Sequence, residues 1–312
     1  MVEVDNLVKH YGSIKAVNGI SFSVKKGEVL GILGPNGAGK STTMKMITCF
    51  LTPNSGTAKV NGFDIHKDPI KVKEQIGYLP ESAPLYNEMT VEKFLKFIAQ
   101  VRGYGGSDAK QRVSKVVETT QLHKVIYQPI HTLSKGFRQR VCFAQALIHD
   151  PPVLILDEPT DGLDPNQKQA VRDLIASMKD EKVIILSTHI LEEVDAICSR
   201  ALIISEGVVK IDGTPAELKA QSESHGSVVI TVNKDNNEEL KSSLNALQSI
   251  KRVQQINGVP ESQLRYCCYP NEGEDLAQDL ALYLSDNNIR AREFKVEEGR
   301  LDEVFRKITR TV

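Results

Sequence analysis

The segment from Gly34 to Thr42, GPNGAGKST, constrains this chain more than any other part of its sequence. It fits the pattern G-x-x-x-x-G-K-[ST], in which the N–H groups of a glycine-rich turn and of a helix start converge on phosphate oxygens. The apolar run 29–33 before it is typical of a buried strand, and the pattern 42–50 after it is typical of a helix. A chance glycine-rich turn would lack this context. The segment therefore predicts a site for a polyphosphate.

The residues of this loop have separate expected roles. The glycines let the backbone turn tightly with its N–H donors inward. Lys40 is expected to reach the β- and γ-phosphates, and the Ser41 hydroxyl is expected to bind Mg²⁺. The residues predicted to contact the nucleotide here are Gly34, Pro35, Asn36, Gly37, Ala38, Gly39, Lys40, Ser41 and Thr42.

Composition narrows the class of protein. The 312 residues, 40% hydrophobic and 25% charged, leave room for two globular domains. The formal net charge of −1 gives no sign of a nucleic-acid partner, and none is expected. The 5 cysteines lack C-x-x-C spacing, so we expect neither disulfides nor a zinc site. We therefore expect the protein to lie in a reducing compartment. The sequence shows no secretory signal, and no apolar run approaches the roughly 18 residues of a spanning helix.

Hydrophobic periodicity indicates an α/β fold up to about residue 221. Residues 2–30 alternate between polar and apolar side chains, which predicts short antiparallel strands. Residues 90–148 have mostly helical periodicity. The apolar runs 153–156 and 183–186 flank a helical segment at 166–179, so this part predicts a βαβ unit with strands buried on both faces of a parallel sheet.

The pattern changes after about residue 222, beyond a polar linker at 221–226. This part shows strands and helices in the order βαββαβ with a closing helix, which matches a ferredoxin-like α+β domain. It contains no catalytic constellation. The expected strands are 227–233, 251–257, 263–269 and 289–296, and the expected helices are 236–248, 274–286 and 299–309.

Two carboxylates, Asp157 and Glu158, end the apolar run 153–156. Ligands of parallel sheets bind at the carboxyl ends of the strands. We expect Asp157 to hold Mg²⁺, through water, and Glu158 to polarise the water that attacks the γ-phosphate. The alternative is an ordinary acidic junction at the surface, which the presence of the phosphate loop makes the weaker interpretation.

Three further motifs follow in a fixed order: LSKGFRQR at 133–140, GLDP at 162–165 and STH at 187–189. With these motifs the chain resembles the ATP-binding subunit of ABC transporters. The resemblance implies a P-loop NTPase of the ABC cassette type over residues 1–221, with a RecA-like core, an antiparallel β subdomain and a helical subdomain at about 82–150. Residues 222–312 would form an accessory domain.

The resemblance also implies roles for single residues, with ATP and Mg²⁺ as cofactors. Tyr11 stacks on the adenine, and Val17 packs beside it. Glu81 occupies the Q-loop position, where it joins Ser41 and Asp157 as a metal ligand. GPNGAGKST is the Walker A loop, and Asp157 with Glu158 is the Walker B end.

The signature segment LSKGF would serve a second copy of the chain. Ser134 is a good N-cap for the helix that follows, and its hydroxyl with the free N–H groups forms an anion site. In the family this site, with Gly136, faces the γ-phosphate bound by the other copy, and Asp164 belongs to the D-loop. The resemblance therefore implies a homodimer with shared ATP sites.

His189 closes the set as the switch histidine of the family. At the carboxyl end of its strand it can donate a hydrogen bond to the γ-phosphate without ionising. A lone histidine is more often structural. Its Ser-Thr-His context at a strand end favours the catalytic interpretation, beside Lys40 and Glu158.

The chain departs from the usual family pattern at three positions. Lys135 replaces a glycine and Phe137 replaces the glutamine of LSGGQ, while Glu81 replaces the Q-loop glutamine. A carboxylate still binds Mg²⁺ but adds negative charge near the phosphates. These features resemble the ABC-2 export branch of gliding-motility and multidrug type, whose C-terminal extension often ends much like residues 299–305.

These observations predict an ATPase subunit that homodimerises around two MgATP and powers a separate multi-span permease, for export. It would be cytoplasmic, peripheral on the inner face of the cell membrane. A soluble ABC ATPase acting on ribosomes or DNA repair is the alternative, but such proteins usually carry two cassettes or a long coiled coil. A regulator that hardly hydrolyses ATP is disfavoured by Glu158.

Segment 84–89 is a candidate docking groove for the permease, or a loop packed on its own helix.

Overall fold

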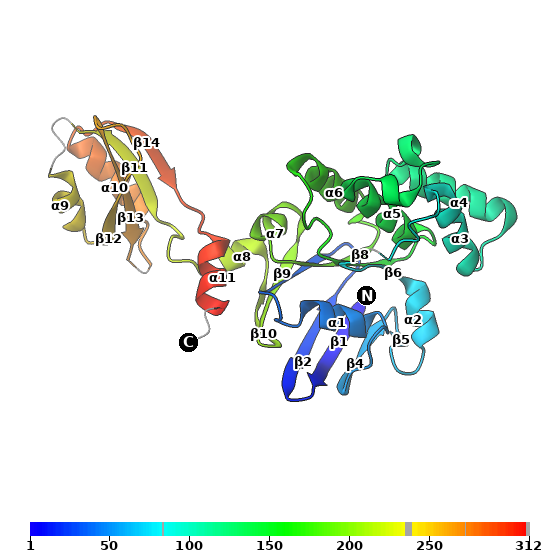
Figure 1. Cartoon of the computed structure of the whole chain (residues 1–312). Helices are drawn as coiled ribbons and strands as arrows, with labels where there is room; N and C mark the ends of the chain where they lie inside the picture. Colours follow the sequence, from blue (N-terminus) through cyan, green and yellow to red (C-terminus); the bar gives the residue numbers. More distant parts are fainter. Residues whose placement is uncertain (83, 235–238, 272, 310–312) are drawn as a thin grey trace. The chain divides into compact units, whose positions relative to one another are not determined.

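The computed structural model describes residues 1–82, 84–234, 239–271 and 273–309. The chain divides into two compact units, Met1–Thr214 and Pro215–Val312. The helix α8 (Pro215–Lys219) belongs to the second unit, whereas the sequence places the end of the cassette at residue 221. Figure 1 shows the elements of both units along the chain.

An antiparallel sheet opens the first unit. Its strands are β1 (Val2–Tyr11), β2 (Ile14–Val24), β4 (Ser55–Val60) and β5 (Phe63–Asp64), in the order β2-β1-β4-β5. The strands expected from the alternation over residues 2–30 are confirmed. Val2 and Val4 on one face are buried while Glu3 and Asp5 are exposed, because successive side chains of a strand point to opposite faces.

A second, mostly parallel sheet holds the phosphate loop. Its strands are β3 (Val29–Leu33), β6 (Ile76–Leu79), β7 (Val153–Asp157), β8 (Val183–Thr188), β9 (Arg200–Ser205) and β10 (Val208–Gly213), in the order β10-β9-β3-β8-β7-β6. Every residue of β3, β7 and β8 is buried, as the apolar runs predict. Because these three strands are parallel neighbours, the residues that follow them meet at one edge of the sheet.

The α-helices described in the first unit are α1 (Lys40–Ile47), α2 (Pro69–Gln75), α3 (Val91–Val101), α4 (Gly106–Thr119), α5 (Lys135–Leu147), α6 (Pro165–Met178) and α7 (Leu191–Ile197). The helical character expected over 90–148 is confirmed by α3, α4 and α5, which pack on one another. α1 starts at Lys40 rather than at Thr42 and ends at Ile47 rather than at Phe50. It ends early because Cys49 takes a left-handed backbone conformation, with φ of 56°.

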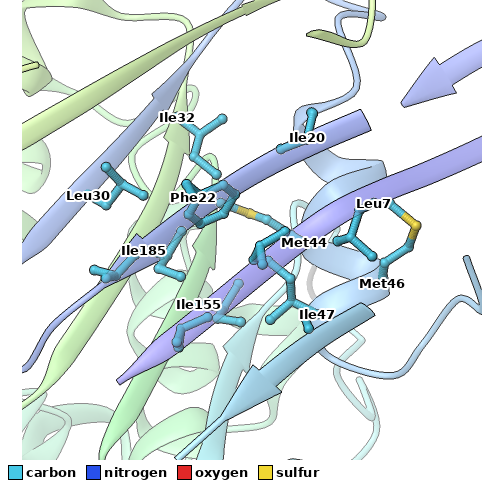
Figure 2. Close-up of a cluster of buried hydrophobic side chains, with 14 of the residues drawn as sticks. Leu7, Ile20, Phe22, Leu30, Ile32, Met44, Met46, Ile47, Ile155 and Ile185 are labelled. Carbon is cyan, nitrogen blue, oxygen red and sulfur yellow. The ribbon is translucent and has the colours of Figure 1, made fainter. Parts of the chain in front are cut away.

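The core of the first unit lies around α1, between its two sheets. Met44 and Ile47 are fully buried and share one hydrophobic cluster with strands of both sheets. Figure 2 shows Leu7 and Ile20 of the antiparallel sheet and residues of the parallel sheet, such as Ile155, around these side chains. This packing on both sides fixes the start of α1 relative to the edge where β3, β7 and β8 end.

The second unit has a sheet and a core of its own. β11 (Val228–Asn233), β12 (Ile250–Ile256), β13 (Gln263–Pro270) and β14 (Ala291–Val296) form an antiparallel sheet in the order β12-β13-β11-β14. α9 (Leu240–Asn245) and α10 (Leu276–Asp286) complete the βαββαβ order that the sequence predicts, and α11 (Leu301–Thr309) packs on α8. Side chains from the sheet, α9 and α10 form the core cluster, for example Tyr266, Leu244 and Leu280.

The helix expected at 236–248 is shorter than predicted. Residues 236–238 lie outside the described residues, and α9 covers only Leu240–Asn245. Its sequence contains Ser242, Ser243 and Asn245, whose side chains compete for backbone hydrogen bonds and weaken helices. The Asn245 amide group bonds to Lys241 O and to Val253 N instead.

None of the helices that the structure describes combines the length and the apolar character needed to cross a lipid bilayer.

Candidate nucleotide-binding site

The phosphate loop turns directly from β3 into α1. Gly39, the N-cap of α1, has φ of 104°, and a Cβ at this position would lie 2.4 Å from Ala16 O. Only glycine therefore fits here. Lys40 follows with only 6% of its surface exposed, and its Nζ donates to Gly34 O at 2.8 Å and to Pro35 O at 3.3 Å. The loop thus holds its own cation inside the turn.

A buried carboxylate joins α1 to the end of β7. Asp157 is 1% exposed, and one of its oxygens, Oδ1, accepts from Ser41 Oγ at 3.0 Å and from Ser187 Oγ at 2.5 Å. This brings together two of the three predicted metal ligands. The sequence did not single out Ser187, although it lies in the Ser-Thr-His motif. Hydroxyl and carboxylate oxygens are the ligands that Mg²⁺ prefers.

Glu158 occupies the centre of the site. Its Oε1 lies 3.6 Å from Lys40 Nζ and its Oε2 lies 2.8 Å from His189 Nδ1. The two other residues predicted to be catalytic, Lys40 and His189, therefore each contact Glu158. Glu158 has φ of 49°, which is uncommon for a residue other than glycine, and its N–H donates to Ser187 Oγ at 3.0 Å. Such backbone outliers cluster at functional sites.

The contact with Glu158 restricts what His189 can do. A neutral imidazole has one N–H, so donation from Nδ1 to Glu158 leaves Nε2 as an acceptor. To donate to a γ-phosphate while neutral, as the sequence predicts, His189 has to break its hydrogen bond to Glu158. The side chain is 46% exposed, which leaves room for that change.

These groups line one cavity of about 650 Å³. Most of the predicted phosphate loop contributes to its wall, together with the predicted ligand Glu81. Three residues that the sequence did not single out also line it: Ile14, Ala16 and Asp161. The lining residues are Ile14, Ala16, Asn36, Gly37, Ala38, Gly39, Lys40, Ser41, Thr42, Glu81, Glu158, Asp161 and His189.

Two residues predicted to contact the adenine lie outside the wall of this cavity. Tyr11 is 49% exposed, with Lys9 Nζ 5.7 Å from its ring centre. Val17 is fully buried, and its Cγ2 lies 3.3 Å from where a Cβ on Gly39 would be. Val17 thus supports the phosphate loop from behind. Adenine stacking on Tyr11 stays a prediction, and Ile14 is the apolar side chain at the cavity itself.

The signature residues do not line the cavity of their own chain. Ser134 is the N-cap of α5, as predicted, and accepts from Phe137 N at 3.4 Å. Asp164 is the N-cap of α6 and accepts from Gln167 N at 2.9 Å. A Cβ on Gly136 would lie 2.3 Å from Gln167 Oε1, so α5 and α6 meet closely here.

Lys135, the residue that replaces a glycine of the usual signature, contacts the rim of the cavity. Its Nζ lies 3.6 Å from Asp161 Oδ2, and both side chains are 53% exposed. An exposed pair of this kind contributes little to stability. It does draw the lysine toward the turn that carries Glu158.

A metal ion at this site would need ligands beyond acidic side chains. Among the residues that the structure describes, no three His, Cys, Asp or Glu side chains are grouped to hold a metal. Mg²⁺ in nucleotide sites commonly uses one or two carboxylates with phosphate oxygens and water. The donor set of Ser41, Asp157 and Glu81 fits that pattern.

Comparison with known proteins places the chain in one family. The sequence model of the family described as ABC transporter matches residues 17–161. The linearmycin resistance ATP-binding protein LnrL of Bacillus subtilis (strain 168) is 33% identical over 99% of this chain and 98% of its own. The daunorubicin/doxorubicin resistance ATP-binding protein DrrA of Streptomyces peucetius is 32% identical over 99% of this chain and 92% of its own.

The fold comparison agrees. A solved structure described as the ATP-binding subunit of an ABC transporter has a TM-score of 0.65 and 32% identity, over 71% of this chain and 92% of that one. The expected cassette fold is thereby confirmed. This chain belongs to the ATP-binding subunits of ABC transporters, a family of ATPases.

Proposed function

We propose that two copies of this chain close around two MgATP, hydrolyse them and power a separate multi-span permease that exports its substrate. The observation that carries the proposal is that Lys40 and His189 each contact Glu158 in the wall of one cavity. A cation, a carboxylate and a hydrogen-bond donor at one point fit phosphoryl transfer to water, where catalysis is mainly positioning and charge stabilisation.

Binding of the triphosphate rests on the phosphate loop. The N–H groups of residues 36–42 and the start of α1 would take the phosphate oxygens, with Lys40 on the β- and γ-phosphates. Ser41, Asp157 and Glu81 would hold Mg²⁺, which when bound neutralises charge on the phosphate oxygens. Lys40 then exchanges the carbonyl oxygens of Gly34 and Pro35 for phosphate.

Hydrolysis rests on Glu158 and His189. When a phosphate oxygen of ATP pairs with Lys40, Oε1 of Glu158 loses its ion-pair partner. It can then accept the proton of the attacking water. His189 would donate to the γ-phosphate from its ring once it leaves Oε2 of Glu158. The two residues therefore exchange partners together when nucleotide enters.

The lining of the cavity supports the proposal of a homodimer with shared sites. Ser134 and Gly136 stand at the start of α5, where free N–H groups form an anion site, but they are absent from the wall of their own cavity. A second copy in head-to-tail arrangement would supply them to the γ-phosphate, along with the turn of Asp164. Each ATP would then be held by both copies.

A separate groove in the first unit fits a segment of the permease. It has a volume of about 450 Å³ and is lined by Phe50, Pro84, Ile98 and Val101 among others. Phe50 is 76% and Val101 is 67% exposed, and both line this one groove. Exposed apolar side chains gathered in one patch mark surfaces that bind a partner. Two buried atoms without a hydrogen-bond partner, Tyr78 Oη and Gln145 Oε1, belong to residues that line the same groove.

Each of the two interpretations of segment 84–89 has one observation that supports it. Pro84 lines the groove. Tyr86 instead packs edge-on against Phe94 and Phe97 of α3, with ring centres 6.0 and 5.5 Å apart.

Export is favoured because LnrL and DrrA both bear drug-resistance names. The chain would then be cytoplasmic and held at the inner face of the cell membrane through the permease.

The test is recovery of the permease with the tagged chain from detergent-solubilised membranes, together with ATP hydrolysis. We expect the chain to hydrolyse ATP and to recover a multi-span protein. Phe50→Glu and Val101→Glu should lose that protein, while Ile70→Glu, at a residue 73% exposed on α2, should keep it. Recovery of ribosomes or DNA-repair proteins in place of a membrane protein would contradict the proposal and favour a soluble ABC ATPase.

A further inference from the structure

A buried carboxylate outside the nucleotide cavity links the two turns that carry the reacting groups. Glu193 lies in the first turn of α7 and is fully buried. Its Oε1 accepts a hydrogen bond from Thr160 Oγ1, and its Oε2 accepts one from Thr188 Oγ1 at 2.7 Å. Burial raises the pKa of Glu193, an effect that the Thr188 hydroxyl and the positive charges of Arg172 and Lys168 oppose.

Both threonines lie within two positions of a residue of the site. Thr160 follows Glu158 by two positions, and Thr188 directly precedes His189. Their side chains are 1% and 0% exposed, so neither can exchange Glu193 for water. Thr188 Oγ1 also accepts from Ile190 N at 3.0 Å, which fixes the backbone on the far side of His189.

The arrangement uses both oxygens of the Glu193 carboxyl group as acceptors. Both hydroxyls donate to it, one to each oxygen. A glutamine would offer one acceptor and an NH₂ group, which leaves at least one buried hydroxyl proton without a partner. A polar group is costly to bury without partners, and hydrogen bonds from two fixed hydroxyls offset that cost.

We propose that Glu193 is a positioning residue for hydrolysis, which holds the Glu158 turn and the His189 turn in register through Thr160 and Thr188. The inference rests on the proposed roles of Glu158 and His189. Glu193 does not line the cavity, and these two hydrogen bonds go to threonines rather than to Lys40 or Ser41. It should therefore govern the rate of the chemical step and leave nucleotide affinity unchanged.

The experiment compares kcat, KM for ATP and melting temperature among variants of the full chain. Glu193→Gln and Thr188→Val should lower kcat by roughly 10- to 100-fold, since small displacements of reacting groups have effects of that size. Their KM should stay within about twofold of wild type, because kcat alone reports positioning of this kind. Thr188→Ser, which keeps the hydroxyl, and Glu192→Gln, an exposed neighbour on α7, should keep wild-type kcat.

Wild-type kcat in Glu193→Gln would overturn the inference, as would a rise in KM that matches the fall in kcat. If Glu193→Gln melts below the assay temperature, the Thr188 variants decide. Equal kcat for Val and Ser then overturns the inference, and a low kcat for Val alone supports it. Glu158→Gln is the reference: if that variant hydrolyses ATP at the wild-type rate, the proposed function fails and not merely the role of Glu193.

Discussion

Lys40 Nζ lies 3.6 Å from Glu158 Oε1, so the cation expected at the phosphates and the carboxylate expected to activate water are paired with each other. Both side chains are at most 10% exposed. A buried pair of this kind is disrupted at high cost when one partner is removed. The phosphates of a bound nucleotide carry negative charge and can take the place of Glu158 as the partner of Lys40. ATP binding would then free the Glu158 carboxylate from this ion pair.

Lys40→Ala should abolish ATP binding or turnover. It removes the side-chain cation assigned to the β- and γ-phosphates and leaves Glu158 without its partner. Nucleotide affinity and ATP hydrolysis are the measurements, and Lys59→Ala, at an exposed lysine of β4, is the control. Turnover at the wild-type rate in Lys40→Ala would refute the assignment of the site.

Glu158→Gln should still bind ATP, because the phosphate loop is untouched, but hydrolysis should nearly stop. The amide lacks the basicity to take a proton from water. Unhydrolysed ATP should then hold two copies together, and size-exclusion chromatography with MgATP should show a dimer. A species that stays monomeric at micromolar protein would argue against shared sites.

Glu81→Gln tests the departure at the Q-loop. Glu81 lines the cavity, and a glutamine would still offer an oxygen to Mg²⁺. We expect activity to be retained and its dependence on Mg²⁺ concentration to shift toward higher metal, since one negative charge is lost. Titration of ATP hydrolysis against Mg²⁺ measures this. Complete loss of activity would mean that the carboxylate takes part in the chemistry.

The parts of the fold that could be predicted are those encoded locally. The strands β3, β7 and β8 are continuous apolar runs between turns, and the residues at their carboxyl ends carry the Walker motifs and His189. Ser134 and Asp164 have the residue types of helix caps and do cap α5 and α6. Each of these features depends on neighbours in sequence.

The parts that could not be predicted depend on distant segments. Ile14 and Ala16 reach the cavity because β2 passes beside Gly39, a contact that no local pattern encodes. Glu193 is one of several acidic residues in a short helix, and only the fold shows that it is buried under two threonines. Asp161 was within four residues of Asp157 but carried no motif that marked it.

His149 should make stability fall in mild acid. Its Nε2 lies 3.1 Å from Ile76 O, and burial lowers its pKa to about 4. In the unfolded chain the His149 imidazole takes up a proton near pH 6.5, whereas in the folded chain it does so only near pH 4. Lowering the pH through this range therefore favours the unfolded state. The contribution is on the order of 1 kcal/mol for each pH unit inside it.

The measurement is the melting temperature at pH 7 and pH 5. His149→Gln should lose less stability between these values than wild type, while His123→Gln, at an exposed position, should behave like wild type. Equal pH dependence in all three proteins would show that His149 is protonated in both states or in neither.

The final prediction concerns the second unit, residues 215–312, whose sheet and core are built from its own residues. The sequence of this unit contains no phosphate loop, so we expect a regulatory or dimer-stabilising module. The sequence places the cut near Glu217, but that position lies inside α8, and a chain ending at Thr214 keeps both sheets and the cavity intact. The shortened chain should bind ATP with wild-type affinity and differ in dimerisation, partner coupling or transport.

The alternative is that the second unit only packs against the cassette, so that its loss unfolds the cassette. Nucleotide affinity and thermal unfolding separate the two, because lost ATP binding with a collapsed melting transition is possible only if the first unit cannot fold alone.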